Sequence, residues 1–293
     1  MPPKRPRSGS PAPVRLGGLV LFRAESGEND LVVTFLTRER GLISALAKNA
    51  RKSVRRFGGG LLSPGTAAWY DFRIREKRDL AFVERGEANP KAPQLPPDPL
   101  IRALSAWALE LARAFEAPRN PAPLSFNLLL RHLGALSRAK DDAPPRLLAR
   151  SLSLSFTKLY MELAGFGAGL EECSRCGRPP EDPGLYLITL NDPRVVCPRC
   201  QKKLPEGVGG GAARFPLPLV EKLGKIKDLK NPVLFSLEEL EAAENFYRAL
   251  AAANSGRRFK SPRAIKGLLE ADSPPDPPEG GKVGEAGNKE GNP

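Results

Sequence analysis

The sequence predicts a multi-domain α+β protein, in which an N-terminal β-barrel precedes a helical domain that carries an inserted four-cysteine segment. Three observations support this prediction. Short β-prone runs fill residues 14–86, apolar stripes at helical spacing occur in 99–172 and 206–270, and all four cysteines fall within 173–205. Because proline-rich stretches mark the boundaries, we expect a disordered basic arm at 1–13, a linker at 87–98 and a disordered tail at 271–293.

The composition indicates the class of partner. The chain carries 46 Lys and Arg against 33 Asp and Glu, a formal net charge of +13, and its pI is about 9.8. A polyanion is therefore the expected partner. No stretch approaches the roughly 20 apolar residues of a membrane-spanning helix, and the N-terminus is basic and proline-rich, without the apolar core of a signal peptide. We expect a cytoplasmic protein with no membrane partner.

The predicted barrel contains five strands. β-prone runs lie at 19–22, 31–36, 42–46, 68–74 and 80–83, separated by glycine, asparagine, aspartate or charged turns. This is the number of strands in an OB-fold, a small Greek-key barrel that binds oligonucleotides. We therefore expect an OB-fold nucleic-acid-binding domain at 14–86.

The fourth predicted strand has two distinct faces. Tyr70, Phe72 and Ile74 share one face, which suits a barrel interior. Arginines on the other face can contact phosphates and a tryptophan can stack a base, although a solvated outer face is the alternative. The candidate nucleic-acid contacts on and just beyond this face are Trp69, Arg73, Arg75, Lys77 and Arg78.

A basic segment, KNARKSVRR, occupies residues 48–56 and runs directly into FGGG. No acidic residue occurs between Glu39 and Asp71. Glycines allow a backbone to approach phosphates closely, so we predict contact with DNA or RNA; a solvated charge run is the alternative. The predicted contacts are Lys48, Arg51, Lys52, Arg55 and Arg56.

Helix signals follow the linker. Asp98 is a predicted N-cap with Pro99 at the first helical position. Further helices are expected at about 123–138 and 144–164, after the Ser236–Glu239 capping box, and from Ser261. The glutamates of EELEAAE at 238–244 are interpreted as a solvated helix face.

The four cysteines have the spacing of a structural metal site. Cys173 and Cys176 form one C-x-x-C pair, and Cys197 and Cys200 form a second. Four thiolates close the coordination of one Zn²⁺, which then stabilises structure and does not activate water. Two disulfides would need an oxidising compartment, and a thioredoxin-like dithiol uses one such pair. We predict one structural Zn²⁺.

Catalytic machinery is scarce in this sequence. His132 is the only histidine, whereas a zinc-protease H-E-x-x-H motif needs two. It lies in an apolar helical run and is interpreted as a helix-face residue. No G-x4-G-K-[ST] loop occurs. We therefore predict a binding protein and not an enzyme.

Several motifs occur in a defined order. A Gly-Glu-x-Asp turn lies at 27–30, Leu-Thr at 36–37 precedes Gly41, and Lys-Asn-Ala-Arg-Lys spans 48–52. ELAGFGAGLEEC leads into Cys173, and Phe-Lys-Ser lies at 259–261. Together these motifs resemble the RecO family of bacterial DNA repair and recombination-mediator proteins over about 14–270. Asn49 replaces a glycine of the family motif, and Ala168 stands where proline is common.

The resemblance implies a mediator that anneals complementary single strands and helps load RecA onto single-stranded DNA covered by single-stranded-DNA-binding protein, in gap and break repair. The implied partners are single- and double-stranded DNA, RecR, the tail of single-stranded-DNA-binding protein and, indirectly, RecA, on the bacterial nucleoid. An acidic, apolar-ended tail needs an apolar pocket edged by a base, for which Arg150 and Lys158 in the helical domain are candidates. Second-tier DNA contacts are Lys202, Lys203, Arg257, Arg258 and Lys260.

Two other classes remain open from the sequence. An RNA- or ribosome-binding zinc-ribbon protein shares the charge and the barrel. A metal-dependent deaminase would need an acid-base glutamate and an open coordination position. Glu171 and Glu172 precede Cys173, but four thiolates leave the metal closed.

Overall fold

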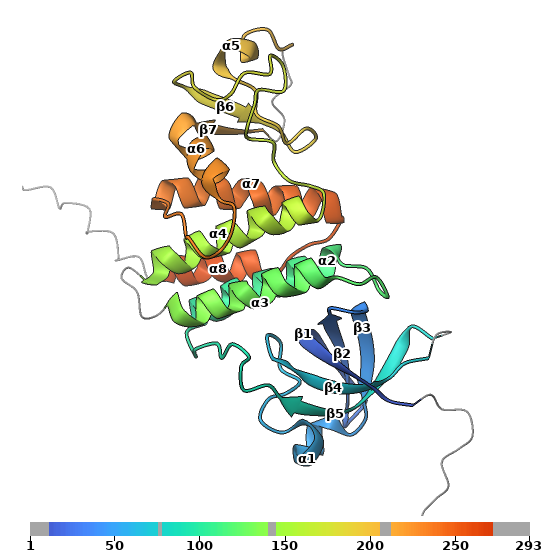
Figure 1. The fold of residues 1–293 in the computed structure, drawn as a ribbon. Helices are drawn as coiled ribbons and strands as arrows, with labels where there is room; N and C mark the ends of the chain where they lie inside the picture. Colours follow the sequence, from blue (N-terminus) through green and yellow to red (C-terminus); the bar gives the residue numbers. More distant parts are fainter. Residues whose placement is uncertain (1–11, 76–77, 140–144, 206–211, 272–293) are drawn as a thin grey trace, which may run out of the picture.

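The computed structural model describes residues 12–75, 78–139, 145–205 and 212–271. The β-barrel lies at one end of an elongated molecule, a layer of helices forms the middle, and the four-cysteine segment lies at the far end (Figure 1). The arm and tail expected to be disordered fall almost wholly outside the described residues, as does Lys77. Among the described helices, none combines the length and apolarity needed to cross a bilayer.

The predicted five-stranded barrel is confirmed. The closed strand order is β1-β2-β3-β5-β4, in which only the β3–β5 pairing is parallel. Two short helical turns, η1 (Ala50–Lys52) and α1 (Val54–Phe57), lie between β3 and β4. The strands are β1 (Val14–Ser26), β2 (Asp30–Thr37), β3 (Gly41–Ala47), β4 (Ala67–Arg73) and β5 (Leu80–Ala88).

Aromatic rings fill the barrel interior. The rings of Phe35 and Tyr70 have centroids 4.7 Å apart, and those of Phe35 and Phe72 are 5.0 Å apart. All three side chains are fully buried, whereas Trp69 is 44% exposed, so the predicted alternation of β4 is confirmed. Burial raises the pKa of Tyr70, whose hydroxyl donates to the backbone oxygen of Leu61.

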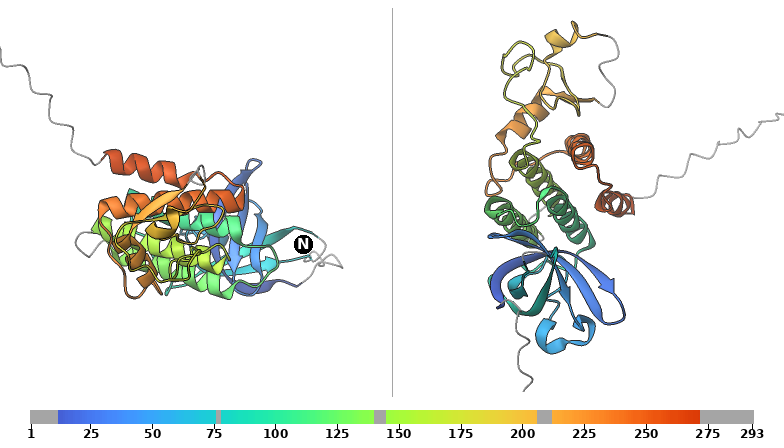
Figure 2. Two further views of the ribbon diagram at one scale, coloured as in Figure 1. Left: turned by 90° about the horizontal axis from the view of Figure 1, so that it is seen from above. Right: turned by 90° about the vertical axis from the view of Figure 1, so that its right-hand side faces the viewer.

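The helical layer follows the predicted boundaries closely. The Asp98 carboxylate accepts the N–H of Ile101 at 2.8 Å, and Ser236 and Glu239 form both bonds of a capping box. In Figure 2, α7 and α8 are seen end-on beside the other helices. The helices are α2 (Pro99–Phe115), α3 (Pro123–Arg138), α4 (Pro145–Leu163), α6 (Leu217–Lys225), α7 (Leu237–Ser255) and α8 (Ser261–Ala271).

The sole histidine belongs to the helical core. His132 is fully buried on α3 and stacks on Phe156 of α4 at a centroid distance of 4.3 Å. Burial lowers its pKa to about 3, so the imidazole is neutral at physiological pH. Between α2 and α4, the indole N–H of Trp107 donates to the Thr157 hydroxyl at 2.8 Å. The Trp107 ring also meets the ring of Phe259 edge-on.

Two cations are buried in the helical core with acidic partners. Arg150 is 7% exposed and makes a bidentate pair with Glu244, which also contacts Arg248 at 3.0 Å. Lys158 is 2% exposed and pairs with Glu162. The interpretation of EELEAAE as a solvated face is therefore wrong for Glu244. Arg150 and Lys158, the candidate bases for an apolar pocket, are both buried and already paired with glutamates.

The barrel and the helices share one junction. The N–H of Leu42 donates to the Ala117 oxygen at 3.3 Å, and the N–H of Ala122 donates to the Arg38 oxygen at 3.0 Å. Leu19, Leu21 and Leu36 on the outside of the barrel belong to the same apolar core as α2 and α3. The loop after α2 therefore clamps the β2–β3 turn.

The cysteine segment extends further than the sequence predicts. It contains β6 (Leu185–Ile188), which pairs with β7 (Ala213–Pro216), and the short α5 (Pro198–Gln201). The sequence assigns 206–270 to helices, but Ala213–Pro216 is a strand. Its backbone groups pair with those of β6, which satisfies the hydrogen bonds of both segments.

Replacing Gly41 by alanine should weaken this junction strongly. Gly41 has φ of 58°, and a Cβ there would lie 2.1 Å from the Asn120 oxygen and 2.6 Å from the Ala117 oxygen. Gly27 has φ of 65° with nothing within 4 Å, so Gly27→Ala is the matched control. We expect Gly27→Ala to cost about 1–2 kcal/mol, the left-handed backbone alone, and Gly41→Ala to cost at least twice as much in urea unfolding. Equal losses of unfolding free energy in the two variants would contradict a tight contact between Gly41 and the loop after α2.

Candidate metal centre and nucleic-acid interface

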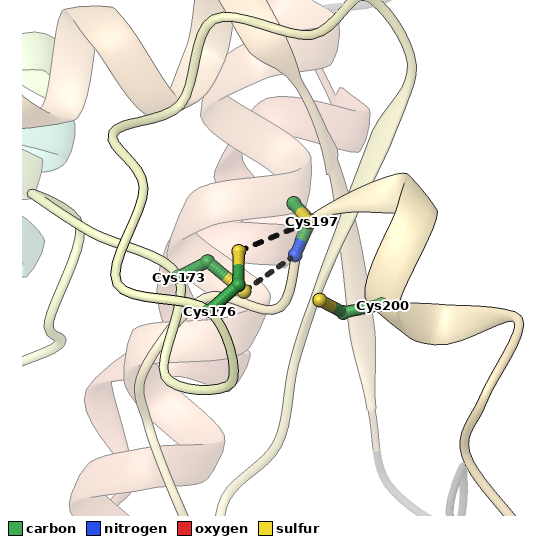
Figure 3. A group of neighbouring side chains, drawn as sticks. All are labelled: Cys173, Cys176, Cys197 and Cys200. Atoms are coloured by element: carbon green, nitrogen blue, oxygen red, sulfur yellow. Dashed lines mark hydrogen bonds between the residues drawn. The ribbon is translucent and has the colours of Figure 1, made fainter.

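The four cysteines converge at one point. Their sulfur atoms all lie within 4.8 Å of one another, and the Sγ atoms of Cys176 and Cys197 are 4.0 Å apart (Figure 3). Cys173 and Cys197 are buried, Cys200 is half-buried and Cys176 is exposed. One metal ion can therefore be bound by all four thiolates, as the spacing predicts.

Backbone turns hold the thiols in place. The N–H of Cys197 donates to the Cys173 sulfur at 3.3 Å, which ties the two C-x-x-C pairs together. The first pair is closed by a bond from the Gly177 N–H to the Cys173 oxygen at 2.8 Å, and the second by one from the Cys200 N–H to the Cys197 oxygen at 3.0 Å. The fold therefore builds the thiol cluster through local hydrogen bonds.

The thiols have unequal proton affinities. Burial raises the pKa of Cys173, but N–H groups of Cys197, Arg175 and Cys176 outweigh it and bring this pKa to about 6. The pKa of Cys200 is raised to about 12. The largest cause is its hydrogen bond with Cys197, and the next is burial. Such neighbouring thiols repel each other when all are ionised, and a divalent cation relieves that repulsion.

The centre belongs to the apolar core of the helical region. Cys173 and Cys197 lie in the same buried cluster as Tyr186, Val195 and Leu219. Two of the arginines near the centre have acidic partners: Arg194 pairs with Asp192 at 2.8 Å, and Arg199 pairs with Asp182 at 2.6 Å. The arrangement therefore supports a structural role for the metal.

The basic segment forms a compact feature that we call the basic knuckle, residues 48–57. The Asp30 carboxylate accepts the N–H of Asn49 at 2.7 Å, and the Asn29 oxygen accepts the N–H of Arg51 at 3.1 Å. Asn49 has φ of 52°, a conformation that asparagine tolerates in place of glycine. The 27–30 turn therefore holds the knuckle, which lies at the barrel end away from the helices (Figure 1).

The cations of the basic knuckle are mostly unmatched. Lys48, Lys52 and Arg55 are exposed and make no ion pair with any described residue. Arg51 pairs with Glu25 at 3.2 Å. Arg56 is half-buried and bonds Ser53 and the Lys48 oxygen, so it stabilises the knuckle itself. The knuckle therefore brings together three cations that have no acidic partner among the described residues.

The outer face of β4 differs in its charge. Arg73 pairs with Glu84 at 2.6 Å. Arg85 pairs with Asp71. Arg15 pairs with Glu87 at 2.7 Å, beside the exposed Trp69. The predicted face exists, but its arginines are engaged across the strands.

The remaining predicted contacts lie apart from the knuckle. Arg75 is half-buried and Arg78 is exposed, both in the β4–β5 connection. The second-tier cations are exposed at two separate places, Lys202 and Lys203 beyond α5, and Arg257, Arg258 and Lys260 between α7 and α8.

The sequence analysis missed Phe82. The Nζ of Lys48 lies 5.6 Å from the centroid of this ring, within range of a cation–π contact. Phe82 is half-buried on β5, cross-strand from both Leu46 and Arg73. The alternation Leu80, Phe82, Glu84 is the signal that places it on the outer face.

An OB-like barrel with a basic knuckle, joined to a helical domain with a four-thiol cluster, is typical of a nucleic-acid-binding protein with a structural metal site. Residues 13–89 match the family model described as "Recombination protein O N terminal", and residues 98–263 match "Recombination protein O C terminal". The chain therefore belongs to the RecO family, whose role is in DNA repair and recombination, as the motifs predict.

Curated relatives agree with this assignment. The chain is 36% identical to "DNA repair protein RecO" of Anaeromyxobacter dehalogenans (strain 2CP-C) over 193 residues, 66% of this chain and 72% of that protein. It is 34% identical to the protein of the same name from Frankia casuarinae over 68% of this chain and 77% of the relative. It is 28% identical to the protein of the same name from Desulfatibacillum aliphaticivorans, over 87% of this chain and 97% of the relative.

Removing one thiol should empty the metal centre and weaken the helical region. We expect Cys176→Ser to lose bound metal, measured by elemental mass spectrometry, and to lower the melting temperature by roughly 5–10 °C, because a bound structural metal contributes to folding free energy. Arg175→Ser, an exposed change in the same turn, should retain both. A metal-free Cys176→Ser protein with an unchanged melting temperature would contradict a structural role.

Proposed function

We propose that this chain is a DNA-binding recombination mediator without catalytic activity. It anneals complementary single strands and helps load RecA onto single-stranded DNA covered by single-stranded-DNA-binding protein, in gap and break repair, together with RecR. The observation that carries this proposal is the group of unpaired cations in the basic knuckle, on an OB-like barrel, in a chain of the RecO family.

The physical requirement for annealing is modest. Two strands repel each other through their phosphates, and a basic surface that binds both raises their local concentration and reduces the repulsion. Lys48, Lys52 and Arg55 are exposed, so phosphates can reach them by displacing water. Annealing neither makes nor breaks a covalent bond, so it needs no catalytic residue.

The proposed DNA contacts combine the basic knuckle with the β4 face. The knuckle supplies the charges with no acidic partner. The remainder are Trp69 and the paired Arg73 on β4, with Arg75, Lys77 and Arg78 in the connection that follows, and the second-tier cations could extend the path. The proposed set on the barrel is Lys48, Arg51, Lys52, Arg55, Arg56, Trp69, Arg73, Arg75, Lys77 and Arg78.

The metal is proposed to be one Zn²⁺. A set of four thiolates suits zinc or an iron–sulfur cluster, and two C-x-x-C turns are the usual zinc arrangement. Cys173, Cys176, Cys197 and Cys200 would hold it, and when bound it would supply a structural cross-link between the loop before β6 and α5 with its N-cap.

A groove in the helical layer fits the acidic tail of single-stranded-DNA-binding protein. The groove, about 740 Å³, lies between α4, α7 and α8. Leu147, Leu237 and Pro262 give it apolar walls. Its charged lining includes Arg263 and Lys266, of which Lys266 pairs with Glu270 at 3.5 Å, and the glutamates Glu241 and Glu244. Leu237 is 65% exposed, and Arg263 makes no ion pair with a described residue. We propose this groove, which Arg150 also lines and Lys158 does not, as the tail site.

A labelled acidic peptide with apolar C-terminal residues tests the groove by fluorescence anisotropy. We expect Arg263→Ala to weaken binding about tenfold, the effect of one charge-assisted contact. Arg257→Ala is the matched control, since Arg257 is exposed but outside the groove. Equal losses in the two variants would indicate general charge attraction and contradict the groove.

Strand annealing tests the function of the knuckle. Complementary oligonucleotides coated with single-stranded-DNA-binding protein are mixed with wild type or with the Lys48→Ser/Lys52→Ser/Arg55→Ser variant. We expect slow annealing by the variant, and a log–log salt slope of single-strand binding shallower by about 2, because three phosphate contacts are lost.

The Arg15→Ser/Arg85→Ser/Lys227→Ser variant is the control, since it removes the same charge from paired positions outside the proposed contacts. Surface pairs contribute little to stability, so both variants should fold. Absence of annealing by wild type would contradict the mediator function. Tighter binding of structured RNA than of single-stranded DNA would favour the RNA- or ribosome-binding alternative.

A further inference from the structure

A cleft opens on the barrel where β3 meets β5. It has a volume of about 740 Å³. Its floor is apolar and includes Leu42, Ile74 and Leu80, of which Leu80 is 39% exposed. The rim carries the three arginines Arg40, Arg78 and Arg119 and the two acids Glu39 and Asp79. An apolar floor with a mostly basic rim suits bases and phosphates together.

The far wall of this cleft comes from the helical region and is held rigidly. Arg119 has φ of 62°, a left-handed conformation that is unfavourable for arginine, so surrounding contacts must maintain it. Its guanidinium donates to the Arg78 oxygen at 2.9 Å and lies 3.7 Å from Asp79. Because the cleft is formed in advance, an occupant loses little free energy to ordering its walls.

The cleft continues toward the basic knuckle. The β3–β5 pairing joins Ser44 to Leu80 and Leu46 to Phe82, and we call the outer face of these paired residues the seam. The seam leads from the cleft to the Phe82 ring. Lys48, the first cation of the knuckle, lies over that ring. Glu84, the next outward acid on β5, is paired with Arg73.

The charge balance distinguishes this seam from the β4 face. Arg40 and Arg78 form no ion pair with any described residue. Arg15, Arg73 and Arg85 around Trp69 are each paired at short range. A phosphate at the seam therefore meets available cations, whereas at the β4 face it must displace a carboxylate.

We propose that single-stranded DNA runs from the basic knuckle across Phe82 into this cleft. One base stacks on Phe82, the following bases lie against Leu80 and the cleft floor, and Arg40 and Arg78 contact their phosphates. The track assigns a base-contacting surface to the barrel, and it rests on the proposed DNA-binding function. OB-folds commonly cover roughly 4–16 nucleotides, which accommodates a path of this kind.

Anisotropy of a labelled oligo-dT of about 20 nucleotides tests the track. We expect Phe82→Ala to weaken binding about tenfold, the loss of one stacked base. Arg40→Ser/Arg78→Ser should make the salt slope shallower by about 1.4, for two phosphates. Phe22→Ala removes an aromatic of β1 that is 39% exposed and outside the cleft, so this control should bind as wild type does. Trp69→Ala is measured beside it, because Trp69 belongs to the proposed contacts of the β4 face.

A fluorescent reporter gives a second readout that does not depend on a loss of affinity. In a Trp69→Phe background, Phe82→Trp places an indole at the proposed stacking position. The one remaining tryptophan, Trp107, is 3% exposed inside the helical layer. We expect oligo-dT to quench the new indole in this protein, and not to quench the Trp69→Phe parent.

The outcomes separate the track from the function. If Phe82→Ala and Arg40→Ser/Arg78→Ser bind as wild type and the new indole is not quenched, while the knuckle variant binds weakly, the track is wrong and DNA binding by the knuckle stands. If Trp69→Ala alone weakens binding, the strand crosses the β4 face and the track is wrong. If wild type itself does not bind oligo-dT, the proposed function fails.

Discussion

The close contact between the β2–β3 turn and the loop after α2 is the constraint on which the rest of this structure depends. The backbone oxygen of Asn120 occupies the space that any side chain at position 41 would need. This contact brings Leu19, Leu21 and Leu36 onto the helical core, so the barrel cannot be treated as a free module. It also carries Arg119 over the barrel surface, where it becomes a wall of the cleft beside β3 and β5.

Local chemistry predicted much of this fold, and long-range pairing explains the rest. Alternation on β4, the Asp98 and Ser236 caps and the two C-x-x-C turns each depend on neighbouring residues, so the sequence alone revealed them. Whether a charge is matched depends on residues far apart in the chain. Arg150 and Glu244 are 94 residues apart, and Arg15 and Glu87 are 72 apart. No periodicity signals such pairs.

The same distinction applies to the candidate DNA interface. The basic knuckle was evident because its cations lie within nine residues and no acid is near in sequence. The role of the β4 arginines changes once their partners on neighbouring strands are known. Phe82 and the cleft were not evident at all, because the cleft combines β3, the β4–β5 connection and a loop of the helical region. Ion pairing therefore separates arginines that already hold a carboxylate from cations available to a phosphate.

The last helix, α8, has a consequence for synthesis on the ribosome. The Glu110 carboxylate of α2 accepts the N–H of Lys260, 150 residues later, and the N–H of Ser261, and Phe259 meets Trp107 edge-on. At roughly 5–20 residues per second, the apolar face of α2 waits about 8–30 s for this partner to be translated. During that interval the side of Trp107 that meets Phe259 in the folded protein has no native partner, even after Thr157 of α4 has been made.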